Sequence, residues 1–217
     1  MSGPRDAQGP RRIGIFGGSF DPVHAGHLHA ARAARSAFAL DRVVFVPAAE
    51  SPHKVGVRMA SGAQRVAMLE LAIRGESAFS VSPIELERGG ASYTIDTVRN
   101  LPAAIGESAD CALYLIVGSD NVALLPTWRE ADLLLARVQP IVVHRAGDPR
   151  VLLTDLEARF GRDIAAKMRA GYIELPPVVV SSTDLRTRFS KGGAHTIDVP
   201  ASVLEYIRAH HVYGAKA

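Results

Sequence analysis

"RIGIFGGSFDPVHAGH", residues 12–27, places the glycine pair Gly17 and Gly18, a proline and two histidines after a short apolar run. A run such as "RIGIF" (12–16) is typical of a buried strand, and "GHLHAARAARSAFAL" (26–40) has the pattern of a helix. The polar segment therefore lies where a strand ends and a helix begins. The same order of strand and helix continues along the chain.

Further extended segments are predicted at 42–48, 79–87, 111–118, 138–145 and 172–180, and further helices at 61–75, 93–106, 151–170, 181–190 and 200–211. Ser61 is the expected N-cap of its helix, and Pro102 is expected to kink or end the helix that contains it. This alternation predicts one α/β domain over 12–214. We expect a doubly wound, Rossmann-like, mostly parallel sheet with helices on both faces, preceded by a disordered N-terminal tail at 1–11.

Composition excludes several classes of protein. The net charge is only +3, basic residues are scattered and aromatic residues make up 6%, so the sequence does not predict nucleic-acid binding. No apolar run approaches the roughly 20 residues that span a bilayer. Residues 1–11 lack the apolar centre of a signal peptide, which predicts a cytoplasmic protein. The single cysteine, Cys111, excludes an internal disulfide and is interpreted as a small core residue.

Chemically dense segments follow four of the predicted strands. They are "GGSFDPVHAGH" (17–27), "AAESPHK" (48–54), "GSDN" (118–121) and "SST" (181–183). In a doubly wound fold ligands bind beyond the carboxyl ends of the strands, where the strand order reverses. We therefore expect the four segments to form one binding site.

The segment at 17–27 suits a phosphate. Gly17 and Gly18 allow close approach of a ligand and a turn with positive φ, and the following helix presents free N–H groups and a positive dipole end. His24 and His27 are three residues apart, so both can face one cleft, and Gly26 keeps that approach open. The spacing matches neither the dinucleotide fingerprint nor the P-loop.

Two other interpretations of this segment were weighed. His24, His27 and His29 could ligate a metal ion, but the sequence offers no nearby cysteine or evident carboxylate set to complete the coordination. An ordinary glycine-rich turn with surface histidines would explain two glycines, but not all eleven residues.

The residues carry a resemblance to a known superfamily. "GGSFDPVHAGH" resembles the G-x-F-D-P-x-H-x-G-H signature of the nucleotidyltransferases, and "VSSTDLR" (180–186) resembles their second signature, I-S-S-T-x-x-R. Within the superfamily the chain is most similar to the bacterial nicotinate-nucleotide adenylyltransferases. The further matches are "SPHK" (51–54), "QRVAMLELAI" (64–73), "ELERGGASYTIDTV" (85–98), "LIVGSDN" (115–121), "PTW" (126–128) and "VLEYIRAHHVYG" (203–214).

The resemblance implies transfer of AMP from ATP to nicotinate mononucleotide, giving deamido-NAD and pyrophosphate in NAD biosynthesis. Mg²⁺ is expected to arrive with the ATP phosphates, and no metal site made by the protein is expected. The attacking phosphate monoester has a second pKa of about 6, so it is already anionic and needs no general base. In agreement, no serine–histidine–aspartate or paired-carboxylate arrangement stands out in the sequence.

The resemblance also assigns residues to roles. The implied catalytic residues are His24, His27 and Arg186. The implied ATP site adds Gly17, Gly18, Ser19, Phe20, Gly118, Asp120, Ser182 and Thr183. The implied nicotinate mononucleotide site comprises His53, Lys54, Tyr93, Thr94 and Trp128.

Simpler interpretations of some of these residues stay open. "SST" could be a plain N-cap followed by a surface arginine, "HK" at 53–54 a solvated loop, and Trp128 a half-buried packing residue. The loop "AAESPHK" also departs from the family, because Ser51 replaces a proline and Ala48 and Ala49 offer no side-chain amide. Two other functions remain as alternatives: a phosphopantetheine adenylyltransferase, and a non-catalytic nucleotide-sensing or RNA-binding module.

Overall fold

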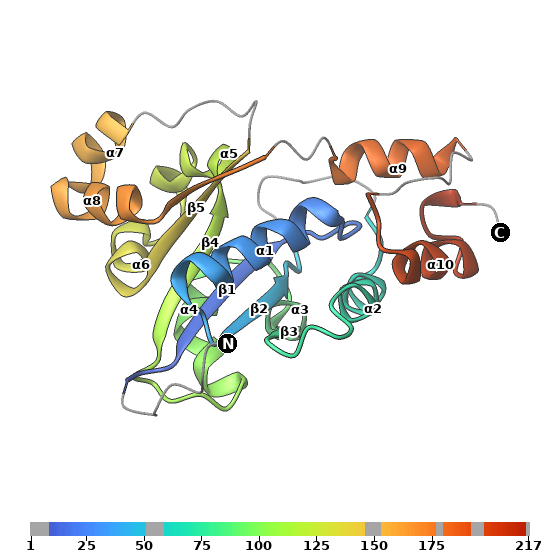
Figure 1. Ribbon diagram of the computed structural model, residues 1–217, viewed down its shortest axis with the longest axis horizontal. Helices are drawn as coiled ribbons and strands as arrows, with labels where there is room; N and C mark the ends of the chain where they lie inside the picture. The colour runs from blue at the N-terminus through green and yellow to red at the C-terminus, as the bar shows by residue number, and fades with distance from the viewer. Residues whose placement is uncertain (1–8, 51–58, 146–152, 177–179, 192–197, 216–217) are drawn as a thin grey trace.

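The computed structural model describes residues 9–50, 59–145, 153–176, 180–191 and 198–215. A six-stranded sheet forms its centre (Figure 1). The strands are β1 (Arg12–Gly18), β2 (Arg42–Pro47), β3 (Phe79–Val81), β4 (Ala112–Gly118), β5 (Gln139–Arg145) and β6 (Tyr172–Leu175), in the spatial order β3-β2-β1-β4-β5-β6. Neighbouring strands pair in parallel throughout. The Rossmann-like doubly wound fold predicted from the sequence is confirmed.

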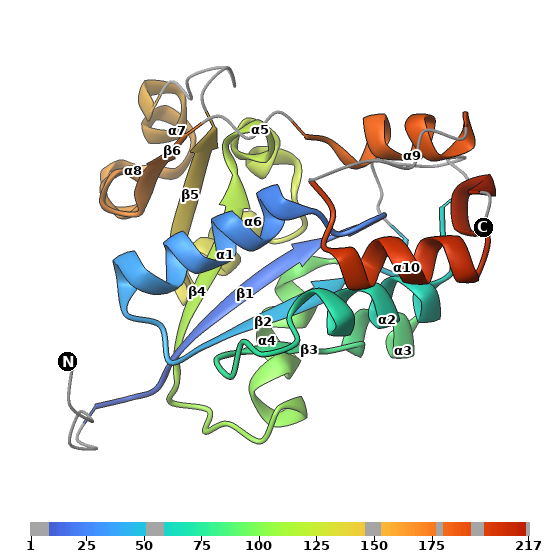
Figure 2. The ribbon, with the colours of Figure 1, turned by 45° about the vertical axis from the view of Figure 1, so that its right-hand side comes forward.

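Helices cover both faces of this sheet. They are α1 (Ala25–Phe38), α2 (Gly62–Ala72), α3 (Ile84–Arg88), α4 (Thr94–Ala104), α5 (Ser119–Val122), α6 (Ala131–Arg137), α7 (Leu153–Phe160), α8 (Arg162–Ala170), α9 (Ser182–Ser190) and α10 (Ala201–Ala209). Two 3₁₀ turns, η1 (Leu125–Thr127) and η2 (Val212–Gly214), complete the described elements. Figure 2 shows α1 crossing one face of the sheet, with α10 lying alongside α2.

The strands alternate their side chains between two cores. In β2, Val43 and Phe45 join the core beneath α1, α2, α9 and α10, whereas Val44 and Val46 join the core beneath α4 and α6. All four side chains are fully buried. A strand that is buried on both faces loses the polar alternation of a surface strand, which explains its continuous apolar sequence.

The order of the strands creates a switch point at the centre of the sheet. The chain builds outward from β1 through β2 to β3, and then β4 pairs with the opposite edge of β1. The carboxyl ends of β1 and β4 therefore diverge into connections that lead to opposite faces. This is where a doubly wound fold leaves room for a ligand.

Three local predictions need correction. The segment 79–87 is extended only over β3, because Pro83 begins the short helix α3, whose Glu85 is fixed by a hydrogen bond from Thr97. The helix predicted over 151–170 is two helices, divided at Gly161, which has a φ of 83°. Helix α4 continues through Pro102 and ends two residues later, at Ala104.

One local prediction is confirmed. Ser61 caps α2 as expected, since its side chain accepts a hydrogen bond from the Gln64 N–H.

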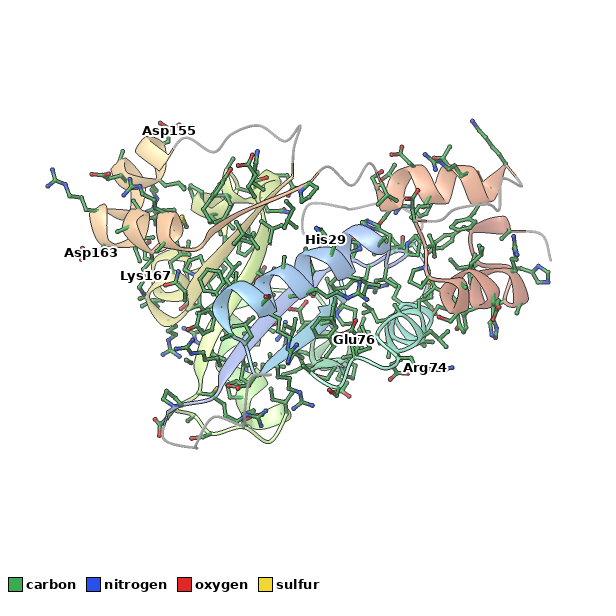
Figure 3. The ribbon with its side chains drawn as sticks, viewed as in Figure 1. His29, Arg74, Glu76, Asp155, Asp163 and Lys167 are labelled. Atoms are coloured by element: carbon green, nitrogen blue, oxygen red, sulfur yellow. The ribbon has the colours of Figure 1, made fainter. Side chains whose placement is uncertain are left out.

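Lys167 connects two helices beside β5. It reaches from α8 toward the last turn of α6, where its Nζ lies 3.3 Å from two main-chain oxygens (Figure 3). Within the described ranges, no helix has both the length and the apolar character needed to cross a membrane. The predicted tail at 1–11 lies mostly outside the described residues.

Candidate active site

A cleft of about 450 Å³ opens at the carboxyl ends of the central strands. Its size is within the usual range of small-molecule sites. All four predicted segments contribute to it. The predicted residues that line it are Gly17, Gly18, Ser19, Phe20, His24, His27, Tyr93, Thr94, Gly118, Asp120, Trp128, Ser182 and Thr183. His53 and Lys54 lie outside the described residues, so their predicted contacts stay predictions.

The first signature lines the cleft, but its backbone conformation differs from the predicted one. Neither Gly17 nor Gly18 has a positive φ; Phe20 has one instead, at 46°. A side chain at Gly17 would meet nothing within 4 Å, whereas a Cβ at Gly18 would lie 3.1 Å from the Phe20 ring. Phe20 is fully buried and packs edge-on against Phe16, so only its backbone is suited to reach a phosphate.

His24 and His27 face the cleft together, as predicted. Their rings stack with centroids 3.7 Å apart, and His24 is the N-cap residue of α1. The His24 N–H donates to Nδ1 of His27 over 3.3 Å. Because Nδ1 accepts, a neutral His27 carries its proton on Nε2 and can donate it to a ligand. A Cβ on Gly26 would lie 3.1 Å from the His24 ring, which explains the glycine between them.

No acidic residue lies in the first turn of α1 to oppose the positive end of the helix dipole, although the Ala25 N–H donates to the Asp198 main-chain oxygen over 2.7 Å. The third histidine, His29, lies further along α1 and does not line the cleft (Figure 3). Among the described residues no group of three or more histidine, cysteine, aspartate or glutamate side chains could hold a metal ion. The positive helix end and the two histidines suit an anion.

The second signature caps α9 and is joined directly to the first. Ser181 is the N-cap, with its Oγ accepting from the Asp184 N–H, so the simpler N-cap interpretation holds for that serine. Ser182 donates from Oγ to the Pro22 main-chain oxygen over 3.0 Å. Arg186 is not a free surface arginine and does not line the cleft; its Nη1 donates to the Asp21 main-chain oxygen over 2.8 Å.

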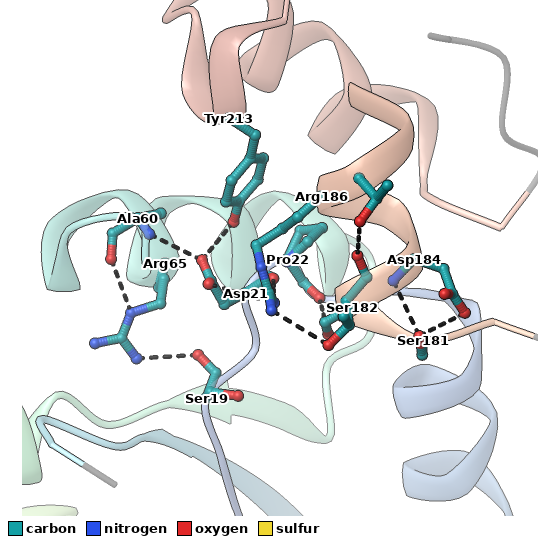
Figure 4. A network of polar contacts seen from close by, with 12 residues as sticks. Ser19, Asp21, Pro22, Ala60, Arg65, Ser181, Ser182, Asp184, Arg186 and Tyr213 are labelled. Carbon is teal, nitrogen blue, oxygen red and sulfur yellow. Dashed lines mark hydrogen bonds and ion pairs between the residues drawn. The ribbon is translucent and has the colours of Figure 1, made fainter. Parts of the chain in front are cut away.

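A buried polar network supports both signatures (Figure 4). Asp21 and Arg65 are almost completely buried, and Arg65 donates to the main-chain oxygen of Ser19 over 3.0 Å. Burial lowers the pKa of Arg65, and the nearby Asp21 carboxylate opposes that shift. The sequence motifs do not predict this network. The feature of the sequence that could have indicated it is Arg65, a charged residue on the apolar face of α2 beside Met68 and Leu69.

An aromatic pocket around Tyr93 and Trp128 forms part of the same cleft. Trp128 lines this pocket and also packs against two apolar cores. One part of its ring is therefore buried, and another part can contact a ligand. The Arg129 guanidinium lies 4.7 Å from the centre of the Tyr93 ring, a cation–π contact. Tyr93 is the N-cap of α4, whose first N–H groups have no acceptor within the helix. The pocket therefore combines an indole face, a cation and helix N–H donors.

Contacts between loops hold this pocket in place. The main-chain N–H of Ala49 donates to Oγ of Ser92 over 2.9 Å, and the Ser92 N–H donates to the Glu50 oxygen over 3.1 Å. Behind them, the buried Thr97 hydroxyl donates to the Glu85 carboxylate, which lines the cleft. The segment "SYT" is thus fixed against the end of β2, which the sequence alone did not indicate.

The end of strand β4 lines the cleft. Gly118 is the N-cap of α5, and the exposed Asp120 follows in its first turn. Asn121 donates to Asp120 Oδ1 over 3.2 Å. A carboxylate and main-chain oxygens at this position can accept hydrogen bonds from the hydroxyl groups of a ribose.

Comparison with known proteins agrees with this geometry. Residues 15–188 match the model of the cytidylyltransferase-like family. A relative from Synechococcus sp. (strain JA-3-3Ab), named a probable nicotinate-nucleotide adenylyltransferase, is 42% identical over 98% of this chain and 99% of its own length. The chain belongs to the nicotinate-nucleotide adenylyltransferase family. A second member of this family, from Bordetella petrii, is 40% identical over 94% of this chain and 99% of its own length.

Two solved structures have the same fold as this member of the nicotinate-nucleotide adenylyltransferase family. The Plasmodium falciparum nicotinic acid mononucleotide adenylyltransferase, solved in complex with NaAD, superposes with a TM-score of 0.68 and 18% sequence identity. The aligned region covers 94% of this chain and 98% of that chain. A putative nicotinate-nucleotide adenylyltransferase from Vibrio parahaemolyticus superposes with a TM-score of 0.63 and 17% identity, over 94% of this chain and 95% of that chain.

Proposed function

We propose that the protein transfers the adenylyl group of ATP to nicotinate mononucleotide, which yields deamido-NAD and pyrophosphate. The observation that carries the proposal is one cleft that combines two kinds of site. Residues of both signatures line it and form an anion site, and Tyr93, Trp128 and Arg129 add an aromatic pocket with a cation. A dinucleotide product fits such a cleft because its phosphates lie between its two rings.

The reaction requires no protein nucleophile. A phosphate oxygen of nicotinate mononucleotide attacks the α-phosphorus of ATP, a new P–O bond forms, and the bond to the β-phosphate oxygen breaks. The electron pair leaves with pyrophosphate. The substrate oxygen is already anionic near neutral pH, so the protein has to align two anions and stabilise the added charge. His27, with its proton on Nε2, is suited to donate to the oxygen on which that charge grows.

The second signature suits the leaving group. The first turn of α9 offers main-chain N–H groups, and Ser182 and Thr183 line the cleft there. Arg186 lies one turn further along the helix and could pair with the β- and γ-phosphates through its planar guanidinium. Mg²⁺ enters as part of the MgATP substrate, held by phosphate oxygens. We also propose a cytoplasmic location.

The aromatic pocket suits a carboxylated pyridine. The cationic ring of the mononucleotide can stack on Trp128, and its carboxylate accepts hydrogen bonds from the N–H groups at the start of α4. The amide of nicotinamide would turn its own N–H₂ toward those donors. Such unpaired contacts cost about 1–3 kcal/mol each, so we expect the acid to be preferred at least tenfold in kcat/KM.

Pyrophosphate release from MgATP, measured with a panel of acceptors, tests this function. We expect turnover with nicotinate mononucleotide, weaker turnover with nicotinamide mononucleotide, and none with phosphopantetheine. Turnover with phosphopantetheine alone would favour the first alternative function. Nucleotide binding without turnover of any acceptor would favour the non-catalytic module.

A further inference from the structure

The carboxylate of Asp21 joins three distant parts of the chain. Its Oδ1 accepts a hydrogen bond from the Ala60 N–H over 3.0 Å and another from the Tyr213 hydroxyl over 2.6 Å. Its Oδ2 lies 3.5 Å from Nη1 of Arg186, the same nitrogen that donates to the Asp21 main-chain oxygen. The start of α2, the second signature and the C-terminal turn thus meet at the middle of the first signature (Figure 4).

This carboxylate depends on its partners. The Asp21 side chain is 0% exposed, and a buried charge is tolerated only when hydrogen bonds and opposite charges compensate it. Oδ2 has no hydrogen-bond partner among the described residues. Tyr213 therefore supplies one of the two hydrogen bonds by which the carboxylate is held, and the only one from a side chain among the described residues.

Tyr213 is itself held firmly. Its φ is 60°, within the turn η2, and its ring stacks on Phe189 of α9 with centroids 6.0 Å apart and planes 19° apart. Burial and the neighbouring Asp21 carboxylate raise the pKa of Tyr213, so the phenol stays protonated and remains a donor. A fixed donor defines where the carboxylate oxygen lies.

We infer that Tyr213 is a positioning residue that acts through Asp21 on Arg186. The Asp21 carboxylate and main-chain oxygen both face Nη1 of Arg186, while Nη2 donates to Oγ1 of Thr183 over 3.2 Å. These contacts fix the plane of the guanidinium beside the cleft. The C-terminal turn, 192 residues from Asp21 in sequence, thereby sets the direction in which Arg186 presents its remaining donors to a ligand.

The physical reason is the sensitivity of phosphate alignment to position. A misplacement of about 1 Å at a reacting group costs roughly a hundredfold in rate. Without the Tyr213 hydroxyl, the carboxylate keeps its bond from Ala60 but is free to rotate toward Arg186. The guanidinium then loses one of the three contacts that fix its orientation, and we expect a loss of about tenfold in kcat. This inference rests on the proposed function, because it concerns the rate of that reaction.

Tyr213→Phe tests the inference in the full-length protein. The substitution removes one hydroxyl and keeps the ring on Phe189. Tyr114→Phe is the matched control, since Tyr114 lies near the start of β4, at the end of the sheet away from the cleft. Steady-state rates of pyrophosphate release would be measured with MgATP and nicotinate mononucleotide, together with urea unfolding of each variant. Turnover by the wild-type protein establishes the proposed function independently of either variant.

We expect Tyr213→Phe to lower kcat about tenfold with an unchanged KM for nicotinate mononucleotide, and Tyr114→Phe to leave kcat unchanged. A purely structural role would lower the urea midpoint of Tyr213→Phe but leave kcat at the wild-type value, which would overturn the inference. In an Arg186→Ala background, Tyr213→Phe should have no further effect on kcat, because the residue it orients is gone. A second tenfold loss in that background would also overturn it.

Discussion

Replacement of His27 by alanine, glutamine and glutamate separates two roles that the structure gives this side chain. Its Nδ1 accepts the His24 N–H at the start of α1, and its ring packs near Phe16 and Phe20 with centroids 6.1 and 5.0 Å away. The first contact stabilises the helix end. We assign the Nε2–H a role in the reaction, as a hydrogen-bond donor to the phosphate oxygen on which charge grows.

The alanine variant loses both roles. The capping hydrogen bond and the packing contacts together are worth about 2 kcal/mol, which corresponds to a fall of roughly 4–8 °C in Tm for a chain of this size. Loss of the Nε2–H donor should lower kcat by about a hundredfold, or ~2.7 kcal/mol of activation free energy.

Glutamine and glutamate are the residues that a capping box favours at this position, because their side-chain oxygen can accept the N-cap N–H. Both should regain about 1 kcal/mol of stability over alanine. Their activities should differ, since glutamine still has an N–H to donate whereas a carboxylate repels the ATP phosphates. From most to least stable, the expected order is wild type, Gln, Glu and Ala, with Gln and Glu close together. From highest to lowest kcat, the expected order is wild type, Gln, Ala and Glu.

The measurements are thermal unfolding and pyrophosphate release at 25 °C, where all four proteins should be folded. The decisive comparison is glutamate against alanine, because the more stable variant should be the less active one. If kcat instead followed stability across the series, His27 would act only as a helix cap. The assignment of the imidazole to the reaction would then be wrong.

Three other variants test the pocket and its support. Trp128→Ala should raise the KM for nicotinate mononucleotide about tenfold while the KM for ATP stays within twofold, and a normal KM for the acid would refute the stacking role. Arg129→Gln should reduce the preference for acid over amide about threefold in kcat/KM; an unchanged ratio would place the guanidinium out of reach of the carboxylate. Thr97→Val keeps the side-chain shape but leaves the buried Glu85 carboxylate short of a donor, so urea unfolding should report a loss of about 2 kcal/mol, and no loss would mean that another donor replaces the hydroxyl.

The sequence by itself determined the fold class and most of the cleft. Apolar strands without a polar face require helices on both sides, and parallel strands bring all of their carboxyl ends to one edge. The residues that follow β1 and β4 were therefore bound to meet, whatever the details of the loops. His24 and His27 could also be paired, because a spacing of three residues at a helix start fixes their relative direction.

Local pattern alone misjudged some positions where tertiary contacts outweigh it. Phe20, rather than a glycine, takes the positive φ, because its ring fills the core beneath Gly18. Glu85 lies in a short helix instead of a strand, where the Thr97 hydroxyl meets its carboxylate. Such contacts join side chains from separate elements, so propensity and periodicity carry no record of them.

Only the tertiary structure decided what supports the site. Nothing in the local sequence around Tyr213 points to Asp21, 192 residues earlier, and the resemblance placed Arg186 on a phosphate without its anchor on the first signature. The physical reason is that a buried charge selects its partners by distance in space, through solvation and hydrogen bonding, and not by separation along the chain. Sequence periodicity specifies which face of an element is buried, but the pairing of buried polar groups exists only once the elements are packed.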